Sequence, residues 1–91
     1  MPTYSDNKTL KFFNAASFQG NFGPFSPDSE AYCIFTVYSN GSGSATYASS
    51  GTFTLAAGVH TLYVGNGDTI SFSGSTSEIK GSYVQFQNVP L

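Results

Sequence analysis

The chain has 91 residues, of which only 8 are charged (Lys+Arg 3, Asp+Glu 5), with one histidine, one cysteine and a formal net charge of -2. Three scattered lysines cannot neutralise the several phosphates on which nucleic-acid affinity depends, and they form no basic patch for anionic lipid, so neither nucleic acid nor membrane is expected as a partner. One cysteine makes no internal disulfide and no cysteine-based zinc site, so a single core held by packing alone is expected.

Strand signals dominate the chain, because β-branched and aromatic residues recur in short runs between Gly, Asn and Ser clusters. No stretch keeps a helical apolar period over two turns. The pattern therefore predicts an all-β protein, a single small antiparallel β-sandwich or barrel domain over residues 1–91. About seven short strands are predicted, in chain order at residues 9–14, 32–38, 44–48, 52–55, 59–64, 69–73 and 82–89.

Residues 15–30 fit neither a strand nor a helix pattern, because Phe18, Phe22 and Phe25 are spaced by Gly, Pro and polar residues. A long aromatic-rich loop is predicted here. Such loops in compact domains are usually functional or disordered, and the aromatic content argues against disorder. Two interpretations stay open: the three rings plug an open end of the sandwich, or they bind a partner together with Tyr4 of an N-terminal arm, residues 1–8.

The run from Tyr32 to Tyr38 is apolar on both of its alternating faces. This pattern is typical of a central strand that is covered on both sides. In a chain of this length, either the sandwich is thick at this point or the outer face of the strand meets another subunit.

Two hairpins are predicted from turn residues. Gly65-Asn66-Gly67 can form a three-residue loop between residues 59–64 and 69–73. In that register Leu62 faces Ile70 and His60 faces Phe72, so the apolar residues share one side. A two-residue loop at Asn66-Gly67 is the second choice, since it mixes the faces. The cluster of Asn and Gly at residues 39–43 predicts another hairpin.

A search for catalytic chemistry finds no supporting pattern. The only histidine, His60, lies about 13 Å along the predicted hairpin from Asp68, too far for a dyad. Cys33 is expected to act as a small buried hydrophobe. Asp28 and Glu30 lack the ligand density of known calcium loops. The chain is therefore predicted to be no enzyme and to have no catalytic, metal or cofactor-binding residues.

Low charge and high aromatic content occur together, at 9% and 16% of the residues. The core of a protein interface is depleted in charge and enriched in aromatic residues, whereas a free-standing small domain carries many charges. A subunit of a larger assembly explains this composition better than a solitary enzyme.

The segment GTFTLAAGVHTLYVGNGDTISF, residues 51–72, sits in a chain that begins Met1-Pro2 and is rich in Gly, Ser, Thr and aromatics. In this style the chain resembles the small all-β accessory proteins of tailed-phage virions, of the head decoration or cement type. The resemblance implies a β-sandwich or β-tulip subunit, often a dimer or trimer, that binds the major capsid protein or another virion protein and stabilises the capsid lattice. It also implies a virion protein of a bacteriophage, assembled in the host cytoplasm. This fits residues 1–8, which are polar and do not resemble a signal peptide, so none is expected.

The alternative function is a carbohydrate-binding or receptor-binding module at a fibre or tail tip. Exposed tyrosines and asparagines can stack on sugars and hydrogen-bond to them, although the chain has no tryptophan. An exposed cluster of Tyr and Asn side chains would favour this alternative.

Overall fold

The computed structural model describes residues 8–90, which form eight β-strands and no helix. The all-β prediction is confirmed, with one strand more than the seven expected. Within the described residues no helix is long and apolar enough to cross a membrane. The strands are β1 (Lys8–Gln19), β2 (Phe22–Phe25), β3 (Tyr32–Ser39), β4 (Ser44–Tyr47), β5 (Gly51–Thr54), β6 (Gly58–Val64), β7 (Ile70–Ser73) and β8 (Ile79–Pro90).

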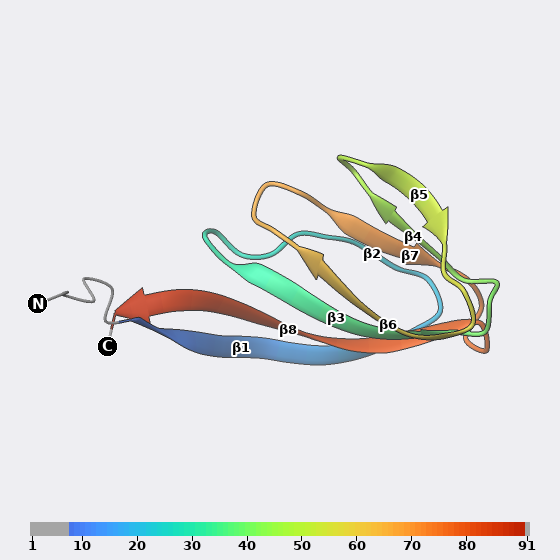
Figure 1. Cartoon of the computed structure of the whole chain (residues 1–91), viewed down its shortest axis with the longest axis horizontal. Helices are drawn as coiled ribbons and strands as arrows, with labels where there is room; N and C mark the ends of the chain where they lie inside the picture. Colours follow the sequence, from blue (N-terminus) through green and yellow to red (C-terminus); the bar gives the residue numbers. More distant parts are fainter. Residues whose placement is uncertain (1–7, 91) are drawn as a thin grey trace, which may run out of the picture.

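The strands form two four-stranded antiparallel sheets in a sandwich-like arrangement (Figure 1). The first sheet has the order β1-β8-β3-β6 and the second the order β2-β7-β4-β5. The chain changes sheet at every connection except β4 to β5, which is the one local hairpin among the described strands. Strands that are neighbours in sequence are therefore mostly not neighbours in a sheet.

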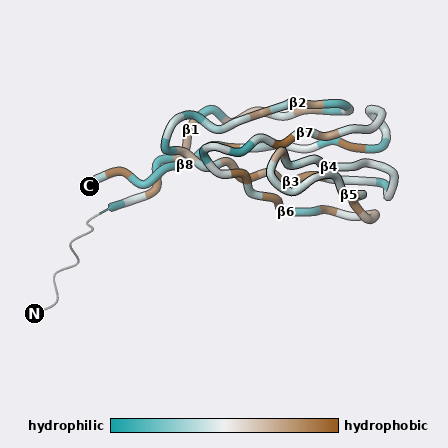
Figure 2. The backbone as a smooth tube through the Cα atoms, turned by 90° about the horizontal axis from the view of Figure 1, so that it is seen from above, coloured by the Kyte–Doolittle hydropathy of each residue, from teal (hydrophilic) through white to brown (hydrophobic). Residues whose placement is uncertain are grey.

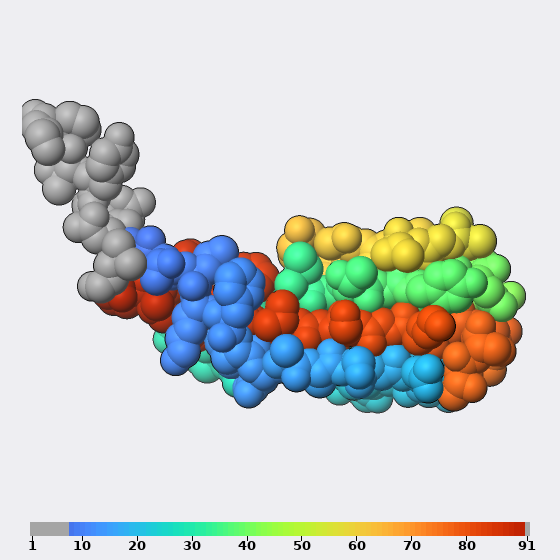
Figure 3. All heavy atoms as spheres, turned by 90° about the horizontal axis from the view of Figure 1, so that it is seen from below, coloured from blue at the N-terminus to red at the C-terminus, as the bar shows by residue number. Residues whose placement is uncertain are grey.

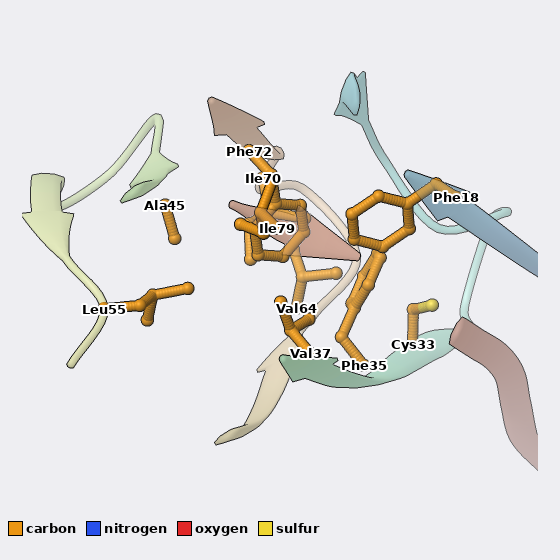
Figure 4. Packing of buried hydrophobic residues seen from close by; sticks show 10 residues of the cluster. All are labelled: Phe18, Cys33, Phe35, Val37, Ala45, Leu55, Val64, Ile70, Phe72 and Ile79. Atoms are coloured by element: carbon orange, nitrogen blue, oxygen red, sulfur yellow. The ribbon is translucent and has the colours of Figure 1, made fainter. Parts of the chain in front are cut away.

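A single apolar core lies between the two sheets (Figure 4). Phe35 and Val37 of β3 are fully buried, while Thr36 between them is exposed, so β3 alternates cleanly between core and surface. The ring of Phe72, from the second sheet, lies 5.3 Å from the ring of Phe35 and 5.1 Å from that of Phe18. The cluster consists of Phe18, Cys33, Phe35, Val37, Ala45, Leu55, Val64, Ile70, Phe72 and Ile79.

The predicted hairpin over residues 59–73 is wrong. β6 pairs with β3 in the first sheet, whereas β7 pairs with β2 and β4 in the second. Leu62 therefore opposes Phe35, and His60 opposes Val37. The glycine-rich segment between the strands carries the chain from one sheet to the other. Alternation in the sequence indicates which side of a strand is apolar, but not which strand lies beside it.

The predicted hairpin at residues 39–43 is also wrong, because β3 and β4 belong to different sheets. The buried hydroxyl of Ser39 holds this crossing in place. It donates to the Leu55 carbonyl at 3.0 Å and accepts from the backbone N–H groups of Gly41 at 3.1 Å and Gly43 at 3.3 Å. A buried polar side chain with three partners here replaces the tight turn that the glycines predict.

The predicted aromatic loop over residues 15–30 is wrong over half its length. β1 continues to Gln19, and after a turn at Gly20 the chain forms β2. A β-bulge hides this in the sequence: Phe13 opposes Gln85 and Ala16 opposes Tyr83, so two residues of β1 face one of β8. Before the bulge the inward side chains are at odd-numbered positions, and after it they are at even-numbered positions. The strict alternation that predicts a strand is therefore interrupted.

The paired ends of β1 and β8 extend beyond the rest of the first sheet (Figures 1 and 2). β3 pairs with β8 only as far as Tyr32 opposite Phe86, whereas β1 and β8 stay paired to Lys8 opposite Pro90. The chain therefore carries a two-stranded ribbon at one end of the first sheet.

Candidate interaction face

Exposed apolar side chains gather on the outer face of the first sheet, which is the surface seen in Figure 3. Residues directly opposite in a ladder share a face, so the strand pairing shows on which face each side chain lies. Seven large hydrophobic side chains are exposed among the described residues, and six of them belong to this face. The six are Leu10, Phe12, Tyr32, Tyr38, Val59 and Tyr63; the seventh, Phe53, lies in the second sheet.

One end of this face is aromatic across three strands. Phe12 of β1 lies beside Phe86 of β8, with ring centroids 6.0 Å apart, and Phe86 stacks on Tyr32 of β3 at 5.8 Å. Phe12 is 58% exposed and Tyr32 is 53% exposed, so their rings present open surface to the solvent. The next residues along the strands, half-buried Val84 and Ile34 and exposed Tyr63, extend the apolar surface towards β6.

Hydroxyl side chains cross the middle of the face. Ser17, Ser82, Thr36 and Thr61 oppose one another in turn across all four strands. Because these side chains are short, the surface is hollowed here: two adjoining shallow hollows share Ser17, Thr36 and Ser82 among their lining residues. The hollow separates the aromatic end from a second apolar group.

Tyr38, Val59 and Lys80 form that second group, at the other end of the face. Val59 is 68% exposed, the largest exposed fraction among the large hydrophobic side chains. The Lys80 ammonium lies 5.6 Å from the centroid of the Tyr38 ring, within reach of a cation–π contact. We call the four rows of side chains, from Phe12 to Lys80, the interaction face.

The outer face of the second sheet has the opposite character. Buried Ala45 and Phe72 point inward, so their neighbours point outward, and every outward residue of β4, β5 and β7 is Ser or Thr. The hydroxyls of Thr46 and Thr52 lie 2.7 Å apart, which satisfies both with one hydrogen bond. These outward residues are Ser44, Thr46, Thr52, Thr54, Ser71 and Ser73. Water solvates such a surface well, whereas a contiguous exposed apolar surface marks an interaction site.

Phe18, Phe22 and Phe25, the rings predicted to bind a partner, pack within the chain. Phe18 is only 9% exposed, and its ring stacks on that of Phe22 at 4.7 Å. Phe22 and Phe25 are half-buried against the core, with ring centroids 5.4 Å and 5.0 Å from that of Tyr83. The packing favours the first of the two interpretations, in which the rings close the protein's own core. Contact between these rings and a partner stays a prediction. The fourth predicted side chain, Tyr4, lies outside the described residues.

The residues of the interaction face were not among the predicted site residues. One available signal was the run from Tyr32 to Tyr38, whose apolar outer side indicates either a thick sandwich or a neighbouring subunit on this face. Another was the pair Phe12-Phe13, since two adjacent residues of one strand point to opposite sides and one of them must leave the core.

His60, Cys33 and Asp68 have structural surroundings. His60 is half-buried, and its Nε2 lies 2.7 Å from the Ala56 carbonyl. Burial raises the pKa of the Cys33 thiol to about 11, so it stays protonated and unreactive at neutral pH. No group of three or more His, Cys, Asp or Glu side chains within residues 8–90 is arranged to hold a metal ion.

Asp68 ties two loops together. Its carboxylate accepts hydrogen bonds from the Ser49 hydroxyl at 2.6 Å, the Thr69 N–H at 2.8 Å and the Ser49 N–H at 3.2 Å. The Ser49 hydroxyl is the main reason why the pKa of Asp68 is lowered, because the bond favours the charged carboxylate. Nearby, burial raises the pKa of Tyr47, whose hydroxyl donates to the Tyr63 carbonyl at 2.6 Å.

Comparison of the chain with protein-family models, curated proteins and solved structures finds no match. The interaction face is therefore interpreted from its own chemistry. It offers aromatic rings that can stack, hydroxyl groups that can donate and accept hydrogen bonds, and one ammonium group.

Proposed function

We propose that this protein is a non-enzymatic structural subunit of a larger assembly and that it buries the interaction face against a neighbouring protein subunit. The difference between the two outer faces carries this proposal. Both sheets have one side away from the core, yet one outer side is hydroxyl-bearing and the other holds six of the seven exposed large hydrophobic side chains among the described residues. Aromatic residues concentrated on one face, with few charges, are typical of an interface core.

The number of rings on the face supports an interface made of several contacts. Fully burying one large apolar side chain contributes about 1.5–3 kcal/mol. Association costs about 4–15 kcal/mol in lost translational and rotational freedom. One ring does not offset that cost, whereas a cluster that spans four strands does.

The assembly that we propose is a phage virion, with the chain as a capsid decoration or cement protein on the major capsid lattice. The resemblance to virion accessory proteins is one support. The strand order is another: β1-β8-β3-β6 over β2-β7-β4-β5 is that of an eight-stranded jelly roll, a sandwich used by viral capsid and lectin domains. This second support is an analogy of fold, which many functions share.

Co-sedimentation with capsids tests this proposal. The purified chain is mixed with particles built from the major capsid protein encoded in the same genome. We expect the wild-type chain to sediment with the particles, Phe12→Ser to be retained less, and Thr54→Ser, on the outer face of the second sheet, to be retained like the wild type. A monomeric chain that binds neither the particles nor another virion protein would contradict the proposal.

A carbohydrate-binding or receptor-binding module remains the second candidate. The hollow lined by Ser17, Thr36 and Ser82 supports it, because these hydroxyls lie beside the Tyr38 ring and a sugar is bound by such a combination of hydrogen bonds and stacking. Glycan-array binding that Tyr38→Ala abolishes would favour this candidate over a capsid role.

A further inference from the structure

We propose that the neighbour on the interaction face is a second copy of this chain. A two-fold axis relates the two copies: it lies between their faces, parallel to the strands and above the boundary between β8 and β3. The inference rests on the proposed function, since it names the subunit that covers the face. Two-fold dimers are the commonest closed assemblies, and they require one surface that complements itself.

The rows of the face match themselves under this axis. Because β8 and β3 are neighbours in the middle of the sheet, the rotation lays β8 of one copy over β3 of the other. This rotation does not shift a row along the strand direction, so Phe86 meets Tyr32 of the second copy and Val84 meets Ile34. Apolar side chains thus cover apolar side chains, and the sheets pack roughly aligned, as in other face-to-face sheet pairs.

The hydroxyl row also meets itself. Thr36 of one copy lies over Ser82 of the other, and Ser17 lies over Thr61, because these residues share one row of the sheet. Short hydroxyls donate and accept, so two such rows satisfy each other or share water. An apolar partner surface would leave these hydroxyls without partners, whereas a second copy does not.

The charges of the face point to the same partner. Lys80 is the one charged side chain in the four rows, and no carboxylate lies among them. Under the proposed axis each Lys80 lies over Tyr38 of the other copy, the type of ring that it already contacts within its own chain. An acidic partner would find only one cation here, so a neutral aromatic surface complements the face better.

The area of the face lies below the lower end of the range for specific interfaces. The four rows span about seven residues on each of four strands about 4.8 Å apart, which at about 3.3 Å per residue gives a flat area of about 450 Å²; the overhanging ends of β1 and β8 extend past β3 and β6 and are not covered under this axis. Specific interfaces bury about 600–1,000 Å² on each partner. We therefore expect a dimer that dissociates at micromolar concentrations.

Sedimentation velocity across a range of chain concentrations tests the inference. We expect the wild type to dimerise. Under this axis the two Lys80 ammonium groups already lie on strands that flank the axis, and Thr36→Lys adds a second pair one row away. Four like charges between faces about 10 Å apart should weaken dimerisation about tenfold or more. The matched control is Thr54→Lys, another exposed strand threonine, on the hydroxyl-bearing outer face of the second sheet; it should dimerise like the wild type.

A mixing experiment identifies the partner as a second copy. Thr36→Lys and Thr36→Glu chains, when mixed, should associate one to one and more tightly than Thr36→Lys chains associate alone, because opposite charges then face each other across the axis. Circular dichroism on each variant confirms that it is folded. A wild type that stays monomeric, or a dimer that Thr36→Lys leaves unchanged, would overturn the inference.

The outcomes separate this inference from the proposed function. A monomeric wild type whose binding to capsids is weakened by Thr36→Lys overturns the dimer and supports the assembly role. A chain that dimerises and shows the expected association on mixing, but binds no virion protein, supports the dimer and contradicts the virion role.

Discussion

At the scale of single residues, the acidic side chains among the described residues lie in the loops, whereas the lysines lie in β1 and β8. Asp28, Glu30, Asp68 and Glu78 all lie in connections between strands. Asp68 joins the β4–β5 turn to the crossing from β6 to β7 through its bonds to Ser49 and Thr69. A charged group that accepts several hydrogen bonds organises a loop whose backbone would otherwise have few partners.

The lowered pKa of Asp68 predicts how stability depends on pH. A carboxyl with a lower pKa in the folded state stabilises the fold above its unfolded-state pKa, and that contribution disappears as the pH falls through the folded pKa. Asp68→Asn should therefore lower the melting temperature at neutral pH and reduce the fall in melting temperature between about pH 5 and about pH 2. Thermal melts of both proteins measure this. Parallel pH profiles would contradict it.

At the scale of elements, the bulge in β1 decides which phenylalanines face the core. Before the bulge Phe12 points outward, next to Phe86; after it the parity has changed, and Phe18 points inward onto Phe72. One strand therefore supplies both the interaction face and the core. Without the extra residue, one of the two rings would point to the wrong side of the sheet.

Two matched substitutions test this division. Phe22→Ser removes a half-buried ring that packs on Phe18 and Tyr83, and it should lower the free energy of unfolding by about 2–3 kcal/mol. Phe12→Ser removes a ring that is 58% exposed and should cost less than about 1 kcal/mol while weakening association. Urea unfolding at a concentration where the chain is monomeric separates the two. Equal losses of stability would show that Phe12 is also a core residue.

At the scale of the whole molecule, the outer faces of the two sheets differ in chemistry. The second sheet presents hydroxyl groups to the solvent, while the first presents rings and one ammonium group. The overhanging ends of β1 and β8 continue the first sheet beyond the core (Figure 1). A two-stranded ribbon is only marginally stable alone.

An interface with so little charge should be insensitive to salt. Raising the ionic strength from about 0.05 M to about 0.5 M screens exposed charge pairs but leaves apolar burial in place. The association constant of the wild type should therefore change by less than about threefold over this range, as measured by sedimentation. A steep fall would indicate that charged groups hold the subunits together.

Sequence alone was enough to predict the all-β class, the single core and the outward apolar side of Tyr32–Tyr38, because these follow from composition and from alternation within one strand. Cys33, Phe35 and Val37 are buried together on one side of β3, as their spacing indicates. The chemistry of the face was also present in the composition, as a shortage of charge and an excess of rings.

Only the tertiary structure decided which strands are neighbours and which rings are covered. Glycine-rich turns look alike whether the chain returns beside itself or crosses to the other sheet, so β6 and β7 were predicted to pair although they lie in different sheets. The bulge in β1 likewise takes Phe18 into the core and leaves Phe12 outside. Strand pairing depends on contacts between segments far apart in the chain, and a local pattern carries no record of them.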